Sequence, residues 1–190
     1  MLRGLYANPE KELVRMRDAG TLVQIARGTY TAKPDTVAPE ELWAPPVEEA
    51  AMAYATAAYG DRVPVLAGVG AARWWHAIPR ALAVTVVAVP EQHRPVTLTT
   101  GGTVVFTVRQ AGTLATVAVP GTLGTFLVTT AEQTLIDLVT RRNLGGIPDE
   151  ATDAARALAP RIDTTRLREL LDTGPMTAAA TVTAFLAATL

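Results

Sequence analysis

The sequence predicts an α+β fold, in which a partial winged helix (one helix and a β-hairpin) precedes a mixed sheet of short strands packed with C-terminal helices. Three observations predict this class. The 190 residues are 49% hydrophobic with a formal net charge of −1, a balance that permits a buried core. Between residues 81 and 120, short β-branched runs alternate with turn residues, as in strands. Before and after that region, capping residues and apolar spacings of three and four residues predict helices.

The order of these signals divides the chain into three segments. Residues 1–33 form the partial winged-helix-like piece, residues 34–46 a proline-rich linker, and residues 47–190 the main α+β domain. No apolar run approaches the roughly 18–20 residues that a membrane span needs, and the charged N-terminus is unlike a signal peptide. We therefore expect a cytoplasmic protein with no membrane partner. The absence of cysteine fits a reducing compartment.

The N-terminal piece begins with Asn8 as the cap of a helix that ends near Gly20, followed by a hairpin over residues 21–31. A helix and a hairpin with a basic tip form the second half of a winged helix. In that interpretation Lys11, Arg15 and Arg27 contact the phosphates of DNA. The alternative is a helix and hairpin that pack on the main domain with their basic side chains in solvent. Only seven residues precede the helix, too few for the supporting helices of a helix-turn-helix.

The main domain is expected to open with a helix over residues 47–59, whose Glu48 and Glu49 suit the first turn. The other expected elements, in order, are a short helix at 69–76, strands within 81–90, 94–100, 103–110 and 115–120, a helix from a capping box at 129–132 to about 142, and helices at 148–158, 163–172 and 176–190. Paired glycines at 101–102 predict a tight hairpin between the second and third of these strands.

The composition excludes several kinds of catalytic site. The chain contains neither serine nor cysteine, so Ser–His–Asp and Cys–His catalysis are excluded. Its two histidines, His76 and His93, supply too few imidazoles for a histidine-rich metal centre. We therefore predict no catalytic residue, no metal site and no resident cofactor.

The small net charge conceals a segregation of charge along the chain. Residues 1–33 carry six bases against three acids, whereas residues 34–61 carry six acids and no base. Residues 62–142 carry seven arginines against three acids. Arginine supplies 15 of the 17 bases, and its planar guanidinium suits phosphate or carboxylate partners. GC-rich coding, which favours arginine over lysine, explains the same bias equally well.

Two groups of residues are candidates for a partner surface. Arginine and aromatic side chains dominate the binding energy of protein interfaces, and they are adjacent in Arg73, Trp74, Trp75 and His76. We expect at least one tryptophan in the core. The other, with Arg73 and His76, is the candidate for a partner surface, whereas burial of both rings with His76 hydrogen-bonded is the simpler and favoured interpretation. The second group is Arg141 and Arg142, at the end of a helix. In the same helix, Asp137 lies among apolar residues and needs a partner.

The order of four segments resembles a known family. "AGTLVQIARGTY", then "VLAGVGAARWWHAIP", then the short strands, then "VTTAEQTLIDLVTR" is similar to the AbiEi antitoxins of type IV toxin–antitoxin systems, over most of residues 13–172. The resemblance implies a winged helix that represses the operon and a larger domain that neutralises a nucleotidyltransferase-like toxin. Two features depart from the family: the winged helix is shortened, and Gln133 stands where an arginine is common, in "QTLID".

These observations lead to three hypotheses. The first is an antitoxin that binds its toxin through Arg73, Trp74, Trp75, His76, Arg141 and Arg142, with residual autoregulation on operator DNA. The second is an enzyme-type antitoxin, an atypical protein kinase that uses ATP and magnesium, with Arg73, Arg141 and Asp137 as candidate catalytic residues. No G-x-x-x-x-G-K-[ST] run supports it. The third is a winged-helix transcriptional regulator without a toxin partner.

Overall fold

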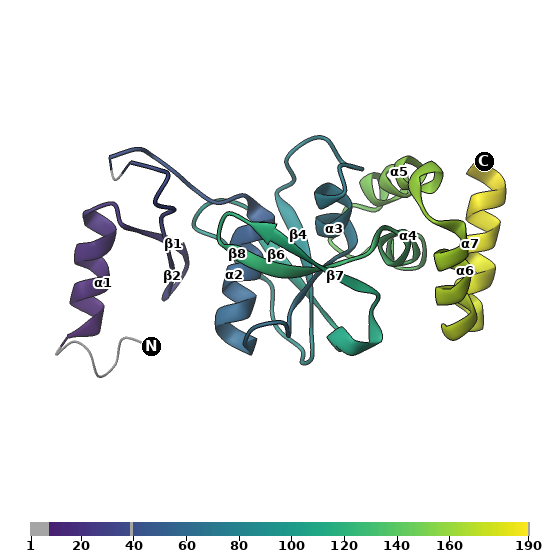
Figure 1. Ribbon diagram of the computed structural model, residues 1–190, viewed down its shortest axis with the longest axis horizontal. Coiled ribbons are helices and arrows are strands. Elements are labelled where there is room, and N and C mark those ends of the chain that lie inside the picture. Colours follow the sequence, from purple (N-terminus) through teal and green to yellow (C-terminus); the bar gives the residue numbers. More distant parts are fainter. Residues whose placement is uncertain (1–7, 39, 190) are drawn as a thin grey trace.

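The computed structural model describes residues 8–38 and 40–189, and it is elongated (Figure 1). Helix α1 (Pro9–Asp18) lies at one end, and helices α6 (Thr164–Thr173) and α7 (Met176–Thr189) lie at the other. A six-stranded mixed sheet with helices on both faces lies between them. The predicted α+β class is confirmed. Within the described residues, no helix combines the length and the apolar character needed to cross a membrane.

Helix α1 and the two-stranded sheet of β1 (Leu22–Ala26) and β2 (Thr29–Ala32) form the N-terminal piece. Asn8 caps α1 as predicted, because its side-chain oxygen accepts from the backbone N–H of Lys11 at 3.2 Å. The hairpin docks on the main domain. Ile25 is fully buried there, and its carbonyl accepts from the backbone N–H of Thr99 at 2.9 Å. One edge of the predicted winged-helix piece is thus part of the main core.

The main domain contains every other element, of which α6 and α7 come last in the chain and follow those given next. In chain order these are α2 (Val47–Tyr59), β3 (Val65–Ala67), α3 (Gly68–Trp74), β4 (Val84–Val89), β5 (Val96–Thr97), β6 (Thr103–Val108), a 3-10 turn (Ala111–Thr113), β7 (Thr116–Gly121), β8 (Gly124–Thr129), α4 (Ala131–Thr140), α5 (Pro148–Leu158) and a second 3-10 turn (Ala159–Arg161). The strand order is β5-β6-β4-β3-β8-β7. The β4–β6 and β3–β8 pairs are parallel and the other three are antiparallel.

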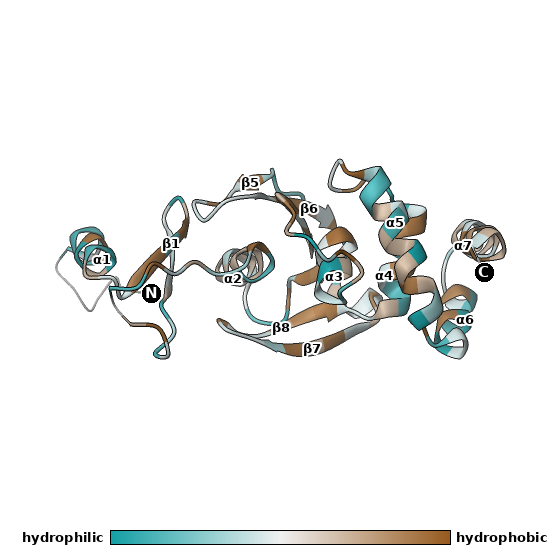
Figure 2. Ribbon diagram, turned by 90° about the horizontal axis from the view of Figure 1, so that it is seen from above, coloured by the Kyte–Doolittle hydropathy of each residue, from teal (hydrophilic) through white to brown (hydrophobic). Residues whose placement is uncertain are grey.

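The sheet is buried on both faces because its central strands β3 and β4 are apolar at every position except Thr85, which is buried as well. In β4, Val87 and Val89 face the core built with α2 and the hairpin, whereas Val86 and Ala88 face the core built with α3, α4 and α5. Seen from above, the sheet curves around α2, and α3, α4 and α5 continue toward α6 and α7 (Figure 2). The start of α2 and the end of α3 nevertheless meet, because Glu48 of α2 contacts Arg73 of α3 at 3.2 Å.

Several predicted boundaries change in the structure. Strands β3 and β8 were not predicted, because three residues of β3 show no alternation and β8 leads directly into a capping sequence. The cap of α4 is Thr130, whose hydroxyl accepts from the N–H of Gln133 at 3.3 Å, one residue later than the predicted capping box. Thr129 is instead buried in the core. Helix α4 ends at Thr140, two residues before the predicted end.

Candidate interaction site

A cavity of about 410 Å³ opens between the start of α2 and the end of α3. We call it the interaction cavity. Its lining includes the four consecutive residues predicted for a partner surface; the full set is Pro46, Glu48, Glu49, Arg73, Trp74, Trp75, His76 and Arg161. A cavity of this size lies within the range of small-molecule sites. The structure therefore brings the first predicted group of residues together around one hollow.

The end of α3 explains how four adjacent residues come to line one cavity. Helix α3 stops at Trp74, and His76 adopts a backbone φ of +56°, a left-handed conformation that residues other than glycine rarely adopt. The chain turns sharply there, so the side chains spread in different directions. Trp75 packs against both cores, and its indole N–H donates to the carbonyl of Thr129 at 2.8 Å. Trp74 is half-buried, with its ring edge-on to Phe126 at 5.0 Å.

Both tryptophans are partly buried, Trp75 against both cores and Trp74 against one, so the structure does not divide them into one core ring and one surface ring. Arg73 is held at the rim of the cavity by two bonds: its Nε donates to the carbonyl of Arg80 at 3.1 Å, and its Nη1 donates to Glu48 at 3.2 Å. The His76 side chain is exposed. Rigid positioning of this kind lowers the entropic cost of binding a partner.

Glu48 is the residue of the cavity that sequence analysis did not single out. Its side chain is only 4% exposed; one oxygen accepts from Arg73, and the other, Oε1, is buried with no hydrogen-bond partner among the described residues. Burial raises the pKa of the Glu48 carboxyl above its ordinary 4.5, against the lowering effects of its own backbone N–H and of Arg73. A buried acceptor without a donor is costly to the folded state.

The raised pKa of Glu48 predicts a pH dependence of stability. A carboxyl whose folded-state pKa is raised contributes stability that is complete below its ordinary 4.5 and is lost as pH rises through the folded-state pKa. We expect Glu48→Gln to gain stability relative to the wild type as pH rises from 4 to 8, because the amide carries no charge that must be buried. Urea denaturation across this range measures the difference. The exposed Glu169→Gln serves as control, and equal curves for wild type and Glu48→Gln would contradict the prediction.

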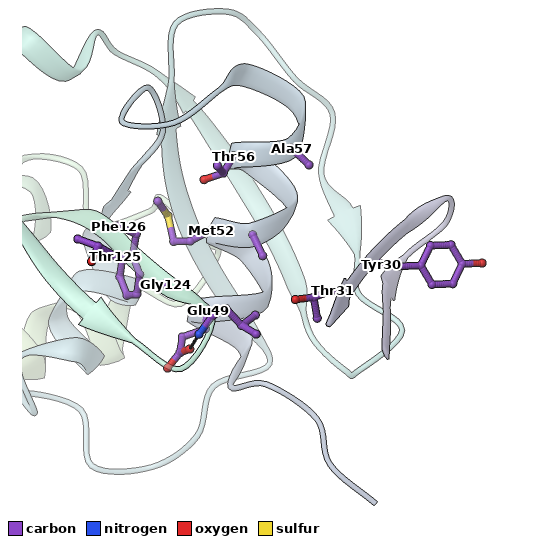
Figure 3. Close-up of a pocket in the computed structure, with 11 residues that line it drawn as sticks. Tyr30, Thr31, Glu49, Met52, Thr56, Ala57, Gly124, Thr125 and Phe126 are labelled. Carbon is purple, nitrogen blue, oxygen red and sulfur yellow. Dashed lines mark hydrogen bonds between the residues drawn. The ribbon is translucent and has the colours of Figure 1, made fainter. Parts of the chain in front are cut away.

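A second pocket, of about 310 Å³, lies between the N-terminal hairpin, α2 and the β7–β8 turn (Figure 3). Its acidic residue, Glu49, is already bound, because one oxygen accepts from the backbone N–H groups of Thr122 at 2.7 Å and Leu123 at 3.1 Å. The ring of Tyr30 points away from α2 (Figure 3). This pocket therefore offers mainly apolar contact from Met52 and its neighbours.

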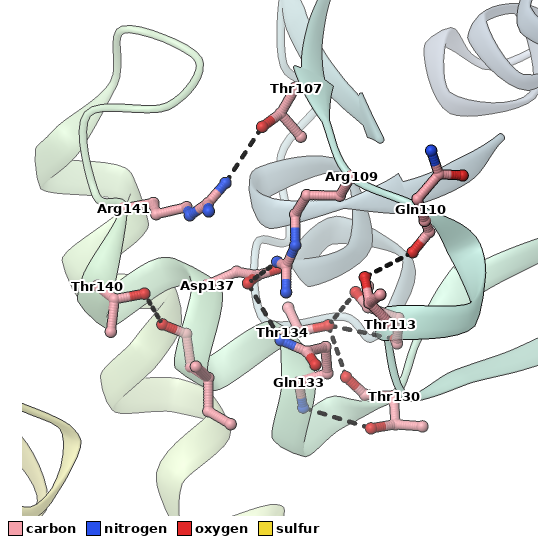
Figure 4. A network of polar contacts seen from close by, with 12 residues as sticks. Thr107, Arg109, Gln110, Thr113, Thr130, Gln133, Thr134, Asp137, Thr140 and Arg141 are labelled. Carbon is pink, nitrogen blue, oxygen red and sulfur yellow. Dashed lines mark hydrogen bonds and ion pairs between the residues drawn. The ribbon is translucent and has the colours of Figure 1, made fainter. Parts of the chain in front are cut away.

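The predicted need of Asp137 for a partner is met by Arg109, which lies just beyond the end of β6. Asp137 is 4% exposed, and one of its oxygens accepts from Arg109 Nη1 at 2.5 Å and from Gln133 Nε2 at 3.1 Å (Figure 4). Burial raises the pKa of Asp137, while Arg109, Arg141 and Gln133 lower it. Gln133 thus contributes a neutral donor to the same carboxylate.

Arg141 and Arg142 lie at the end of α4, away from the interaction cavity. Both are exposed, and Arg141 Nη1 donates to the hydroxyl of Thr107 at 3.2 Å (Figure 4). They line a different cavity, of about 470 Å³. Trp75 contacts Thr129, which lies two residues before the start of α4, and a ten-residue helix is about 15 Å long. The residues predicted to contact the toxin therefore form two groups at opposite ends of α4.

The same separation applies to the candidate catalytic residues of the kinase hypothesis. Arg73 lies at the interaction cavity, whereas Asp137 and Arg141 belong to the network at the other end of α4. Asp137 is enclosed by its partners, which leaves little room for a metal or a phosphate. In the part of the chain that the structure describes, no group of three or more histidine, aspartate or glutamate side chains is arranged to hold a metal ion.

The three residues predicted to contact DNA are all exposed. Lys11 and Arg15 lie four residues apart on α1, so they share one face of the helix, and Arg15 also pairs with Glu12. Arg27 lies at the tip of the hairpin. Contact with operator DNA stays a prediction.

Comparisons with known proteins bear on the fold. No family model matches the chain, and the search of curated proteins found no match. Among solved structures, the chain is similar to the crystal structure of the RV2827C protein from Mycobacterium tuberculosis, with a TM-score of 0.58 and 20% identity over 94% of this chain. The chain covers 64% of that protein, less than two thirds of its length. At this level of identity, the similarity supports the α+β architecture.

Proposed function

We propose that the protein is an antitoxin that neutralises a cognate nucleotidyltransferase-like toxin by binding it directly. The observation that carries the proposal is the gathering of Arg73, Trp74 and His76 around the interaction cavity. Tryptophan and arginine account for most interface hot spots, above all where a concave pocket surrounds them. The order of sequence segments that resembles the AbiEi family supports the same function.

Direct binding is favoured over phosphorylation of the toxin by the state of Asp137. A kinase needs open carboxylates for magnesium and a cationic clamp beside them. Here the carboxylate of Asp137 is already held by Arg109 and Gln133, and Arg73 lies at the other end of α4. The exposed arginines of the second cavity, Arg141 and Arg142, give the toxin a second point of contact in this proposal.

Trp74→Ala is expected to weaken binding of the proposed nucleotidyltransferase-like toxin by about thirtyfold, the effect of losing one hot spot of about 2 kcal/mol. His76→Gly is expected to weaken it as well, and glycine suits the φ of +56° at this position, so the backbone is not strained. Isothermal titration calorimetry gives the affinity, and co-expression with the toxin tests rescue of growth.

Trp43→Ala is the matched control, because it removes the same ring from the linker, outside the lining of the interaction cavity. Full affinity in Trp74→Ala and His76→Gly, with loss in Trp43→Ala, would place the toxin elsewhere. A toxin that gains the mass of a phosphate group when incubated with this chain, ATP and magnesium would overturn direct binding in favour of the kinase hypothesis.

A further inference from the structure

Strand β7 ends the main sheet on one side, and its outer edge is unpaired. In the strand order it lies beside β8 only, and it follows the outer rim of the main domain (Figure 2). The carbonyl of Ala115, just before the strand, accepts from the N–H of Thr130 at 2.9 Å. Because inward and outward groups alternate in an antiparallel ladder, the backbone groups of Thr116, Ala118 and Pro120 point away from β8. In the described part of the chain, no backbone hydrogen bond engages these outward groups.

This edge lacks most of the features that protect an exposed strand from pairing. Protected edge strands are very short, carry charges or are covered by another element. Strand β7 has six residues, and residues 110–131 contain no charged side chain. Val117 and Ala118 are both exposed, one on each face of the strand. Pro120 removes one outward N–H, which leaves the donors of Thr116 and Ala118 for a further strand.

The edge is also held rigidly. The turn between β7 and β8 is fixed to α2, because the buried carboxylate of Glu49 accepts from the N–H groups of Thr122 at 2.7 Å and Leu123 at 3.1 Å. In the ladder, Val119 lies opposite Phe126, and both pack in the core beside α2. A strand that is already extended and anchored loses little conformational entropy when another strand pairs with it.

A second copy of β7 complements this edge. In an antiparallel pair centred on Ala118, that residue lies opposite its own counterpart, and Thr116 lies opposite the Pro120 of the other copy. Each Ala118 N–H then donates to the Ala118 carbonyl across the axis, and each Thr116 N–H donates to a Pro120 carbonyl. Every outward donor is thus used. The missing N–H of Pro120 falls at the end of the pair, where the Thr116 carbonyl faces water.

Side chains and charge favour the same arrangement. Val117 of one copy lies opposite Val119 of the other, at a position without hydrogen bonds, where side chains approach most closely. Val117 is 39% exposed, so pairing covers an apolar side chain that the single chain leaves in water. Around a two-fold axis, like charges would face like charges, and the uncharged edge avoids this repulsion. The same absence of charge gives the edge nothing with which to select a charged partner.

We propose that the protein self-associates through β7, in an antiparallel edge-to-edge pair centred on Ala118 that joins two main sheets into one. The association is weak, because about four backbone hydrogen bonds and a narrow strip of side chains form the contact. Such pairing requires no toxin, so it stands or falls separately from the proposed antitoxin function.

A cysteine on the two-fold axis tests the register, because the chain has no cysteine of its own. Opposed residues of a hydrogen-bonded pair have Cα atoms about 5.5 Å apart, which suits a disulfide. Ala118→Cys, oxidised at submillimolar concentration, is expected to form a covalent dimer on non-reducing gel electrophoresis. Val117→Cys is the matched control, because this exposed neighbour faces Val119 rather than itself. Equal cross-linking of the two variants, or none in Ala118→Cys, would contradict the register.

Opposite charges on the axis test the pair without a covalent bond. Ala118→Lys and Ala118→Glu each place like charges against one another, so each is expected to sediment as a monomer at concentrations where the wild type dimerises. An equimolar mixture of the two is expected to restore association, because the substituted charges then attract. Ala118→Pro removes both central bonds and keeps the bonds to β8, as Pro120 does, and is expected to weaken association at least about tenfold.

Sedimentation equilibrium of the full chain up to millimolar concentration measures all of these states, and circular dichroism verifies that each variant is folded. A wild-type chain that stays monomeric over this range would overturn the proposal. A dimer that persists unchanged in Ala118→Lys, Ala118→Glu and Ala118→Pro would overturn it as well, because the contact between copies would then lie elsewhere. So would a mixture of the two charged variants that stays monomeric.

Discussion

Replacement of Arg109 by alanine is expected to lower the free energy of unfolding by about 3 kcal/mol at pH 8. The substitution leaves the carboxylate of Asp137 buried with only the amide of Gln133 as a donor. Breaking a buried ion pair from one side costs about 3–5 kcal/mol, and the lower end applies because the Arg109 side chain is 19% exposed. The expected loss also depends on pH, because a proton can replace the missing guanidinium.

The sign of that dependence follows from the pKa of Asp137, which burial already raises and which loss of Arg109 raises further. Below the ordinary pKa of 3.8 the carboxyl is neutral in both states, and the cost of Arg109→Ala is smallest; it grows as pH rises. Urea denaturation at pH 4 and pH 8 measures both values. Asp137→Asn in the Arg109→Ala background is expected to recover most of the loss, because it removes the buried charge.

Arg156→Ala is the matched control for this prediction. Arg156 pairs with Asp153 three residues away, at 2.8 Å, but both side chains are more than half exposed. Exposed pairs of this kind contribute less than about 1 kcal/mol. Equal losses in Arg109→Ala and Arg156→Ala, or a loss in Arg109→Ala that does not change with pH, would show that the Asp137 pair does not carry this stability.

Local sequence signals predicted much of the helical part of the fold. Helices α2 and α5 have the predicted bounds. Acidic residues in the first turn and Gly60 at the end determine the bounds of α2, and Pro148 determines the start of α5. The cap of α6 at Asp163 is likewise confirmed, with its carboxylate accepting from the N–H of Thr165 at 2.9 Å. Capping and helix termination depend on residues within one turn of the helix end, so a short stretch of sequence is enough to predict them.

Features that depend on distant contacts were not predictable in the same way. Arg109 and Asp137 are 28 residues apart, and nothing near either residue indicates the other. Gly70 is a similar case: a Cβ there would lie 2.2 Å from the hydroxyl oxygen of Thr85 and 2.8 Å from a methyl group of Leu66. Its role is the close approach of α3 to the sheet, which no local sequence pattern indicates.

Some residues of the candidate site were predictable from the sequence and others were not, for the same reason. Adjacent Arg73, Trp74 and His76 were predicted from their residue types, because interface chemistry is a property of single side chains. Glu48 was interpreted only as a helix-start residue. Its burial beside Arg73 comes from the packing of α2 against the end of α3, which are 25 positions apart at this contact. The sequence therefore predicted the arginine and the aromatic residues of the cavity but not the contribution of Glu48.

Trp75→Ala is expected to lower the free energy of unfolding by about 3–5 kcal/mol, the usual cost of truncating a packed tryptophan. The ring packs against both cores, and its N–H bond to Thr129 connects the end of α3 to the end of β8. Trp75→Phe keeps part of the apolar area but removes this hydrogen bond and some packing volume, so its expected loss is smaller, about 1–3 kcal/mol. Urea denaturation at constant pH ranks the variants.

Comparison of Trp75→Ala with Trp74→Ala separates a role in stability from a role in toxin binding. Its ring packs against one core only and faces Phe126, so its loss of stability should be smaller than that of Trp75→Ala, while its loss of toxin binding should be larger once both proteins are folded. Equal destabilisation by the two substitutions would show that both rings belong to the core. In that case the binding energy assigned to Trp74 would have to come from Arg73, His76 and the exposed arginines of α4.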